Sequence, residues 1–150
     1  MSDATIKSNE TPSKQGQTYR VLLVDDDSDM LTMLHRRLSS HFKTSAKFTL
    51  ASNVNDALDD LSHQRFDMII SDLDMDDLNG LHLLKRVKEQ APLIQVIILT
   101  GHQSANAIRS SMRLGADEFL TKPIDNEVLG EAVDYLIKRQ ARLRATCSSD

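Results

Sequence analysis

Five short apolar runs alternate along this chain with five longer segments of helical spacing, and this alternation restricts the possible folds more than any other feature. The runs are Val21–Val24, Phe48–Leu50, Met68–Ile70, Val96–Leu99 and, more weakly, Glu118–Leu120. Short apolar runs separated by helices are typical of a parallel sheet that is covered on both faces. Since crossovers between parallel strands are right-handed, the pattern predicts an α/β fold with a doubly wound, five-stranded parallel sheet and helices on both faces.

The segments between the runs carry apolar residues every three or four positions, as one face of a helix does. These stripes comprise Met30, Met33, Leu34 and Leu38; Val54, Ala57, Leu58 and Leu61; Leu81, Leu84 and Val87; Ala105, Ile108 and Met112; and Val128, Leu129, Val133, Leu136 and Ile137. Ser52 or Asn53 can cap the second helix and Asp125 the last, because their side chains accept hydrogen bonds from free backbone N–H groups. Gly115 suits the end of the fourth helix.

Composition divides the chain into three parts. Residues 1–18 are polar, without an apolar period, and predict a disordered tail. The patterned region, residues 19–140, is long enough to bury a core and indicates one domain. Residues 141–150 continue the pattern of the last helix among basic residues, beyond what we expect the sheet to cover. They predict either a solvated helix extension or the start of a linker or dimerisation helix.

The overall composition excludes several classes of function. The net charge of −4 gives no reason to expect a nucleic-acid partner, whose binding needs a basic face. No apolar run reaches the length of a membrane span, and the N-terminus has no apolar signal core. The single cysteine, Cys147, cannot form an internal disulfide, and the five histidines lack the spacing of zinc ligands. We therefore expect a cytoplasmic protein with no direct nucleic-acid or membrane partner.

Charged and polar side chains follow four of the five predicted strands. Asp25, Asp26 and Asp27 follow the first strand, Asp72 the third, Thr100 the fourth and Lys122 the fifth. A single aspartate after a strand is often only a helix cap or a turn residue. In a doubly wound sheet, however, the carboxyl ends of the strands meet at one edge, where ligands bind. The four positions together therefore indicate a site composed of acids, a hydroxyl and an ammonium group.

The stretch SDLDMDDLNG, residues 71–80, places four carboxylates within six positions. Carboxylates this close repel one another, and burying them is costly unless a cation or hydrogen-bond donors compensate. One chemical task fits: a carboxylate can attack a phosphoryl group and form an acyl phosphate. That reaction needs a hard divalent cation, usually Mg²⁺, and donors such as Thr100 and Lys122 on the phosphoryl oxygens.

At these residues the chain resembles the receiver domain of bacterial two-component response regulators, including the chemotaxis regulators. Four motifs carry the resemblance: VLLVDD (21–26), IISDLDMDDLNG (69–80), VIILTG (96–101) and GADEFLTKP (115–123). The resemblance covers about residues 19–140. It implies a flavodoxin-like fold with the strand order 2-1-3-4-5, for which a chemotaxis regulator is a standard example.

The resemblance also implies a phosphorylation site and a metal site. Asp72 would be the residue that is phosphorylated. Asp26 would bind Mg²⁺ directly, Asp25 would help through a water molecule, and the backbone carbonyl of Asp74 would be a further ligand. Together with Asp72, these residues would form the metal site.

A second group of residues would respond to the phosphoryl group. Thr100 would donate a hydrogen bond to it and Lys122 would pair with it. Phe119 would be the aromatic switch residue on the fifth strand, unless it is ordinary core. The resemblance further implies a cis peptide bond between Lys122 and Pro123.

The function implied is that of a phosphoryl-accepting receiver in a two-component phosphorelay. A sensor histidine kinase or phosphotransfer protein would donate the phosphoryl group, and the face formed by the fourth helix, fifth strand and last helix would switch. The partner of that face would be a downstream effector, an output domain or a second copy of the chain. Beyond self-phosphorylation and self-dephosphorylation, no enzymatic activity is expected.

Some positions depart from the family pattern. Asp76 stands where the family usually has Pro, which leaves the loop less restricted, and Asn79 stands where the family often has Asp. Asp74 and His102 occupy positions that tune dephosphorylation in relatives, although both side chains could simply be solvated. A degenerate receiver that only binds a partner is therefore a remaining alternative, which the intact acids, Thr100 and Lys122 oppose.

Two other classes fit less well. A haloacid dehalogenase-type phosphatase also has an Asp-x-Asp after a strand, but there that strand comes early and the paired acids late, and this chain has no room for a cap domain. Turnover of a generic phosphate ester would distinguish such an enzyme. An EF-hand calcium loop starting at Asp72 would need Gly where Asp77 stands and Glu where Leu83 stands.

Overall fold

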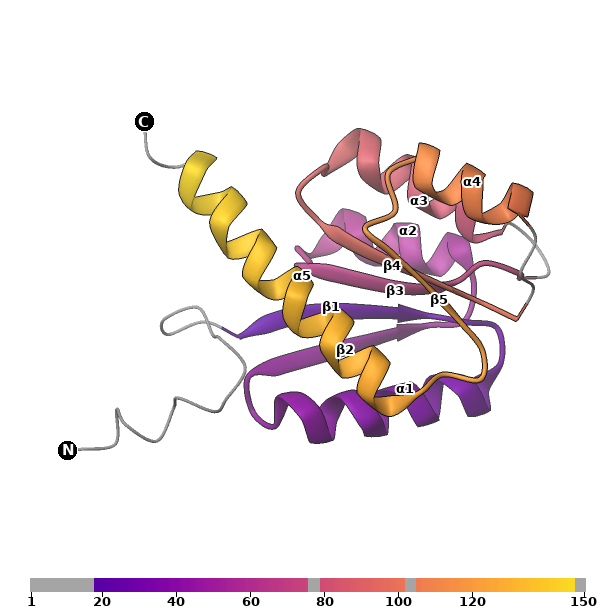
Figure 1. The fold of residues 1–150 in the computed structure, drawn as a ribbon, viewed down its shortest axis with the longest axis horizontal. Coiled ribbons are helices and arrows are strands. Elements are labelled where there is room, and N and C mark those ends of the chain that lie inside the picture. The colour runs from indigo at the N-terminus through magenta and orange to yellow at the C-terminus, as the bar shows by residue number, and fades with distance from the viewer. Residues whose placement is uncertain (1–17, 76–78, 102–104, 148–150) are drawn as a thin grey trace.

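The computed structural model describes residues 18–75, 79–101 and 105–147. Its five strands are all parallel and lie in the order β2-β1-β3-β4-β5, as predicted (Figure 1). The strands are β1 (Tyr19–Val24), β2 (Ala46–Ala51), β3 (Met68–Asp72), β4 (Gln95–Thr100) and β5 (Glu118–Thr121). The expected disordered tail falls, except for Thr18, outside the described residues.

Five helices cover the two faces of the sheet. They are α1 (Ser28–Phe42), α2 (Val54–His63), α3 (Gly80–Gln90), α4 (Ala105–Arg113) and α5 (Asn126–Cys147). Helices α1 and α5 pack on one face, whereas α2, α3 and α4 lie on the other (Figure 1). Within the described ranges, no helix combines the length and the apolar character that crossing a bilayer requires.

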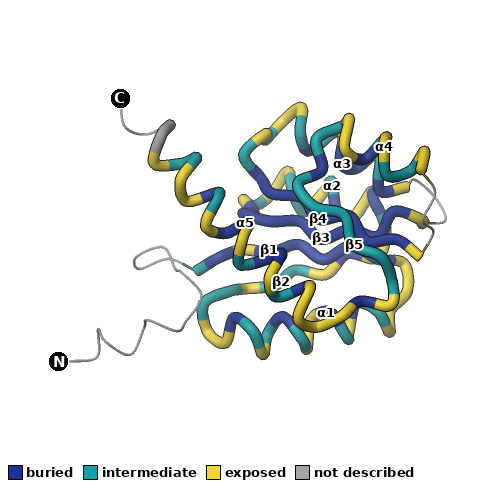
Figure 2. The backbone as a smooth tube through the Cα atoms, in the orientation of Figure 1, coloured by how far each residue is buried: buried dark blue, intermediate teal, exposed yellow. Residues whose placement is uncertain are grey.

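The central strands are buried on both faces, which explains why they read as continuous apolar runs (Figure 2). Successive side chains alternate between two hydrophobic clusters. Leu23 and Ile70 belong to the cluster under α1 and α5, and Leu22 and Ile69 belong to the cluster under α2 and α3. At about 1.5–3 kcal/mol for each large side chain, this burial is the main force that holds the sheet between its helices.

The predicted helix ends are confirmed where the structure describes them. Asn53, rather than Ser52, caps α2, and Asp125 accepts hydrogen bonds from two backbone N–H groups in the first turn of α5. Gly115 follows α4 with φ at +100°, a conformation that favours glycine. These short connections start each helix close to the end of the preceding strand.

Helix α4 packs less closely than its apolar stripe suggests. Only Ser111 is buried on this helix, whereas Ala105 is exposed, Ile108 is half-buried and Met112 is 52 % exposed. The stripe therefore identifies a helix correctly but does not identify core residues. It faces outward and lines a shallow hollow together with Arg109 and Arg113.

Helix α5 is held to the sheet beyond the apolar stripe that ends at Ile137. Gln140 is 2 % exposed, and its side-chain amide donates hydrogen bonds to the carbonyl oxygens of Asp67 (2.8 Å) and Leu93 (3.1 Å). One turn later, Arg144 lies 3.7 Å from the Asp67 carboxylate. Polar contacts thus hold the helix to the sheet as far as Arg144, and whether residues 141–150 form a helix extension or the start of a linker stays a prediction.

Candidate functional site

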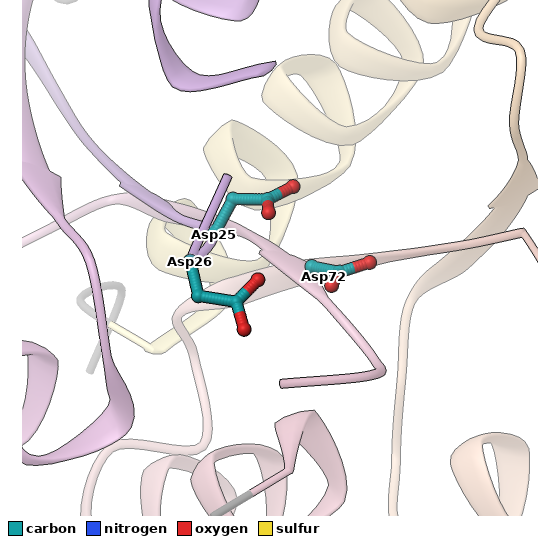
Figure 3. Close-up of side chains that lie close together, drawn as sticks. All are labelled: Asp25, Asp26 and Asp72. Atoms are coloured by element: carbon teal, nitrogen blue, oxygen red, sulfur yellow. The ribbon is translucent and has the colours of Figure 1, made fainter. Parts of the chain in front are cut away.

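Three carboxylates lie together at the carboxyl edge of the sheet (Figure 3). Asp25 and Asp26 follow β1, and Asp72 is the last residue of the neighbouring strand β3, which extends two residues beyond the apolar run Met68–Ile70. One oxygen atom of each side chain lies within 4.8 Å of the others. Asp25 and Asp72 are buried, at 1 % and 4 % exposure, whereas Asp26 is exposed.

The three consecutive aspartates after β1 have different contacts. The Asp25 carboxylate accepts a hydrogen bond from the backbone N–H of Asp27 (2.9 Å), which helps to fix its orientation within the cluster. The Asp27 side chain caps α1 and accepts hydrogen bonds from the N–H groups of Asp29 and Met30. Asp27 is therefore a structural residue, and Asp25 and Asp26 are the acids of the site.

Lys122 provides a positive charge for the acid cluster. Its ammonium group lies 2.9 Å from an Asp72 oxygen and 3.3 Å from an Asp25 oxygen. The backbone N–H of Lys122 donates to the carbonyl of Thr100 (2.7 Å), which fixes the chain after β5 against the end of β4. The Lys122–Pro123 peptide bond is cis, as expected. The predicted convergence of residues from strands β1, β3, β4 and β5 is thus present.

Electrostatics favours a cation at this position. Burial, together with the neighbouring Asp25 and Asp74 carboxylates, raises the pKa of Asp72 to about 6, although Lys122 opposes this shift. Burial alone would lower the pKa of Lys122, but its contacts with Asp72 and Asp25 outweigh burial and raise it. One ammonium group cannot neutralise three carboxylates.

The donor set fits a hard divalent cation. Its ligand atoms are all carboxylate oxygens, the type that Mg²⁺ and Ca²⁺ prefer, and no nitrogen or sulfur ligand belongs to the cluster that the described residues form. The exposed side chain of Asp26 leaves the cluster open to solvent on one side. A cation could therefore enter and retain water ligands, as Mg²⁺ usually does.

Thr100, the last residue of β4, is fully buried, and its hydroxyl donates a hydrogen bond to the Asp74 carboxylate (3.2 Å). The sequence placed both residues at this edge but did not predict their contact. This contact could have been anticipated from the pairing of β3 with β4, which sets Asp72 opposite Leu99. Thr100 and the segment after Asp72 must then leave the sheet side by side.

Phe119 lies on β5, opposite Ile98 of β4, and packs partly buried against the cluster under α2 and α3. Val96 and Ile98 belong to the same cluster. Since every second side chain of a strand shares a face, Thr100 lies on that face too. The two predicted switch residues are therefore on neighbouring strands and on the same side of the sheet.

Gly80, the first residue of α3, is a site residue that the sequence analysis missed. Its N–H donates to the Leu73 carbonyl (2.8 Å), and a Cβ atom at this position would collide with the backbone oxygen of Asp72. Only glycine lets α3 begin this close to the acidic strand end. A lone glycine directly before a helical stripe was the available signal.

Three residues discussed from the sequence, Asp76, Asp77 and His102, lie outside the described residues. A separate hollow of about 520 Å³ lies at the opposite edge of the sheet, where the strands begin. Its lining includes Leu61, Phe66, Ile94 and Arg144, and it contains none of the acids of the site. The acidic site is thus an open cluster at the strand ends, and this hollow is not part of it.

Comparison with known proteins places these features in one family. The family model described as the response regulator receiver domain matches residues 21–134. The transcriptional regulatory protein GlrR of Escherichia coli K12 is 35 % identical over 121 residues, which cover 81 % of this chain and 27 % of the relative. The DNA-binding transcriptional regulator NtrC of Proteus hauseri is 37 % identical over 109 residues, which cover 73 % of this chain and 22 % of that protein.

Solved structures give the same result. The signal receiver domain of an HD domain-containing protein from Pseudomonas fluorescens Pf-5 superimposes with a TM-score of 0.79 at 27 % identity. The match covers 84 % of this chain and 99 % of that domain. The chain therefore spans a whole domain of this kind, but only about a quarter of the length of the two regulators.

Proposed function

This chain belongs to the response regulator receiver domain family, and on this basis we propose that Asp72 accepts a phosphoryl group with the help of Mg²⁺. One observation carries the proposal: the carboxylate of Asp72 is buried beside two further acids and contacts Lys122 at 2.9 Å. A buried acid cluster with one paired lysine suits a reaction that brings a phosphoryl group and a cation to the same place.

The donor would be a phosphohistidine of a sensor histidine kinase or phosphotransfer protein. An Asp72 oxygen attacks phosphorus, so that an O–P bond forms while the N–P bond breaks, and the electron pair of that bond stays on the departing imidazole. Lys122 remains beside the acceptor and balances charge on the phosphoryl oxygens. The hydroxyl of Thr100 donates a hydrogen bond to one of these oxygens.

The residues proposed to hold Mg²⁺ are Asp26 and Asp72 directly, Asp25 through water, and the backbone carbonyl of Asp74. When bound, the ion would offset the negative charge that collects as the phosphoryl group approaches the carboxylates. The close grouping of the carboxylate oxygens supports this ligand set, and their chemistry favours an oxygen-seeking cation.

The proposed response is a change of the face formed by α4, β5 and α5. When Thr100 turns to the phosphoryl group, it vacates space into which Phe119 can move from the neighbouring strand. The face carries exposed apolar side chains that a partner could cover, namely Met112, Val128 and Tyr135. The proposed partner is an effector or output domain, in keeping with the transcriptional regulators among the relatives, or a second copy of the chain.

Phosphorylation with a small donor tests the central proposal. Incubation with Mg²⁺ and acetyl phosphate should add one phosphate to the intact mass, and chelation by EDTA should prevent this. Asp72→Asn protein should gain nothing. The same adduct on Asp72→Asn protein would show that the acceptor is another residue. Steady turnover of a generic phosphate ester would indicate an enzyme rather than a receiver, whose only expected catalysis is self-phosphorylation and self-dephosphorylation.

A further inference from the structure

Thr100 is engaged before any phosphoryl group is present. Its hydroxyl donates to Oδ2 of Asp74 at 3.2 Å, and the threonine side chain is fully buried while Asp74 is exposed. A threonine hydroxyl carries a single hydrogen and can donate one hydrogen bond at a time. Thr100 therefore cannot donate to Asp74 and to a phosphoryl oxygen on Asp72 together.

We propose that the side chain of Asp74 is a positioning residue that restrains Thr100 in the unphosphorylated state and competes with the phosphoryl group for its hydroxyl. The inference rests on the proposed function, in which Asp72 carries that group. It concerns the carboxylate of Asp74, whereas the proposed metal ligand is the backbone carbonyl of the same residue. Substitution of the side chain thus leaves the ligand atom in place.

The location of Asp74 makes such a restraint reversible. When Thr100 turns away, the exposed carboxylate can exchange the lost hydrogen bond for water, so releasing it costs little. A buried acceptor would be left unsatisfied and would hold the hydroxyl far more strongly. An exposed acceptor opposite a buried donor therefore sets a modest bias toward the resting state, which a phosphoryl group can overcome.

Asp74 also carries charge, which by itself would disfavour a phosphoryl group nearby. Asparagine separates the two effects, because its side-chain oxygen can still accept the hydrogen bond but carries no charge. Alanine removes both the charge and the acceptor. The difference between Asp74→Asn and Asp74→Ala therefore reports the hydrogen bond, provided that it disappears when the hydroxyl of Thr100 is removed.

The test is the affinity for beryllium trifluoride, an unreactive phosphoryl mimic, in the presence of Mg²⁺. Asp74→Asn and Asp74→Ala are compared, each with Thr100 and with Thr100→Val. With Thr100 present, the alanine variant should bind about 3–10-fold more tightly than the asparagine variant, which corresponds to one modest hydrogen bond. With Thr100→Val the two should bind equally. Equal binding with Thr100 present, or an unchanged difference with Thr100→Val, would overturn the inference.

A second measurement examines the resting state without any ligand. The NMR couplings of the Thr100 methyl group report how many rotamers the side chain populates. A single rotamer is expected in the wild type and in Asp74→Asn, and averaging in Asp74→Ala; one rotamer in all three would contradict the restraint. Folded wild type that fails to bind the mimic at all would overturn the proposed function itself, and this inference with it.

Discussion

Asp72 is a residue whose position suits its proposed reaction and not the stability of the metal-free protein. Its pKa of about 6 exceeds the ordinary value of 3.8, so the folded state holds its proton more tightly than the unfolded state does. The contribution of Asp72 to the free energy of unfolding should therefore fall as the pH rises from 4 to 6 and stay lower above that range, and the difference between wild type and Asp72→Asn isolates it. The loss is on the order of 2–3 kcal/mol, because each pH unit between the two values is worth about 1.4 kcal/mol.

Asp72→Asn should accordingly stabilise the metal-free protein at pH 7.5, by about 1–3 kcal/mol. Lys122 keeps its contact with Asp25 in this variant, so its charge is not left unpaired. Urea unfolding in EDTA measures the effect, and saturating Mg²⁺ should reduce it because the ion stabilises the wild type. Equal or lower stability of the variant in EDTA would mean that Lys122 already compensates the acid cluster.

Asp26 and Asp27 are neighbours in sequence but should differ in their effect on metal binding. Asp26 belongs to the acid cluster, whereas Asp27 caps α1. Asp26→Asn should weaken Mg²⁺ binding by about tenfold or more, since even outer-shell changes cost that much. Asp27→Asn removes the same charge but keeps a good cap and should have little effect. Calorimetric titration compares them, and equal losses would mean that net charge, not ligation, determines the affinity.

At the scale of elements, the junction of β3 and α3 depends on the absence of a side chain at Gly80. Gly80→Ala would push the start of α3 away from the backbone of Asp72, and we expect it to cost about 1–3 kcal/mol, as overpacking does. Gly101→Ala is a matched control, because a Cβ atom there would meet nothing within 4 Å. Urea unfolding measures stability, and the rate of phosphorylation by acetyl phosphate measures the site.

Both quantities should fall for Gly80→Ala, since the helix and the acceptor share this backbone contact. Stability comparable to that of the Gly101→Ala control would show that the loop absorbs the extra methyl group. A normal phosphorylation rate in a destabilised Gly80→Ala protein would limit the role of Gly80 to packing.

The elements were predictable because each one carries its own signal. The strands β3 and β4 are buried on both faces and so contain the continuous apolar runs Met68–Ile70 and Val96–Leu99. The capping side chains of Asn53 and Asp125 mark where helices begin. The orientation of α4 was not predictable in this way. Its stripe of Ala105, Ile108 and Met112 has helical spacing, yet whether that face meets the sheet or solvent depends on how the helix docks.

In the site, too, some features follow from the sequence pattern and others depend on the three-dimensional arrangement. Asp25, Asp72, Thr100 and Lys122 could be brought together from sequence, because parallel strands place their carboxyl ends at one edge. No comparable rule predicts the contacts that the loops after the strands make. The pairing of β3 with β4 brings Thr100 near the segment after Asp72, but the hydrogen bond from Thr100 to Asp74 and the close approach of Gly80 to the strand also depend on the path of the loop after β3.

At the scale of the whole molecule, the proposed switch connects the acid cluster to the distant face of α4. Thr100→Ala should still accept a phosphoryl group on Asp72, because the acceptor, the other acids and Lys122 remain. It should couple this event poorly to α4, since the hydroxyl that follows the phosphoryl group is absent. Hydrogen exchange with and without beryllium trifluoride, followed over residues 105–115, measures the coupling.

Wild-type protein should change its protection over this segment when the mimic binds, and Thr100→Ala should change much less. Equal changes in the two proteins would contradict the Thr100–Phe119 route. They would leave the assignment of Asp72 intact, because modification of that residue is measured separately by mass.

The attachment of α5 by Gln140 bears on whether two partners can bind this domain at the same time. The proposed acceptor, Asp72, is the last residue of β3, whereas Gln140 of α5 donates to the carbonyls of Asp67 and Leu93, just before β3 and β4 begin. A donor protein delivering a phosphoryl group to Asp72 and a partner bound to the last turns of α5 would therefore lie at opposite ends of the sheet. The two partners could therefore be bound at the same time, and phosphorylation of Asp72 would not require either of them to dissociate.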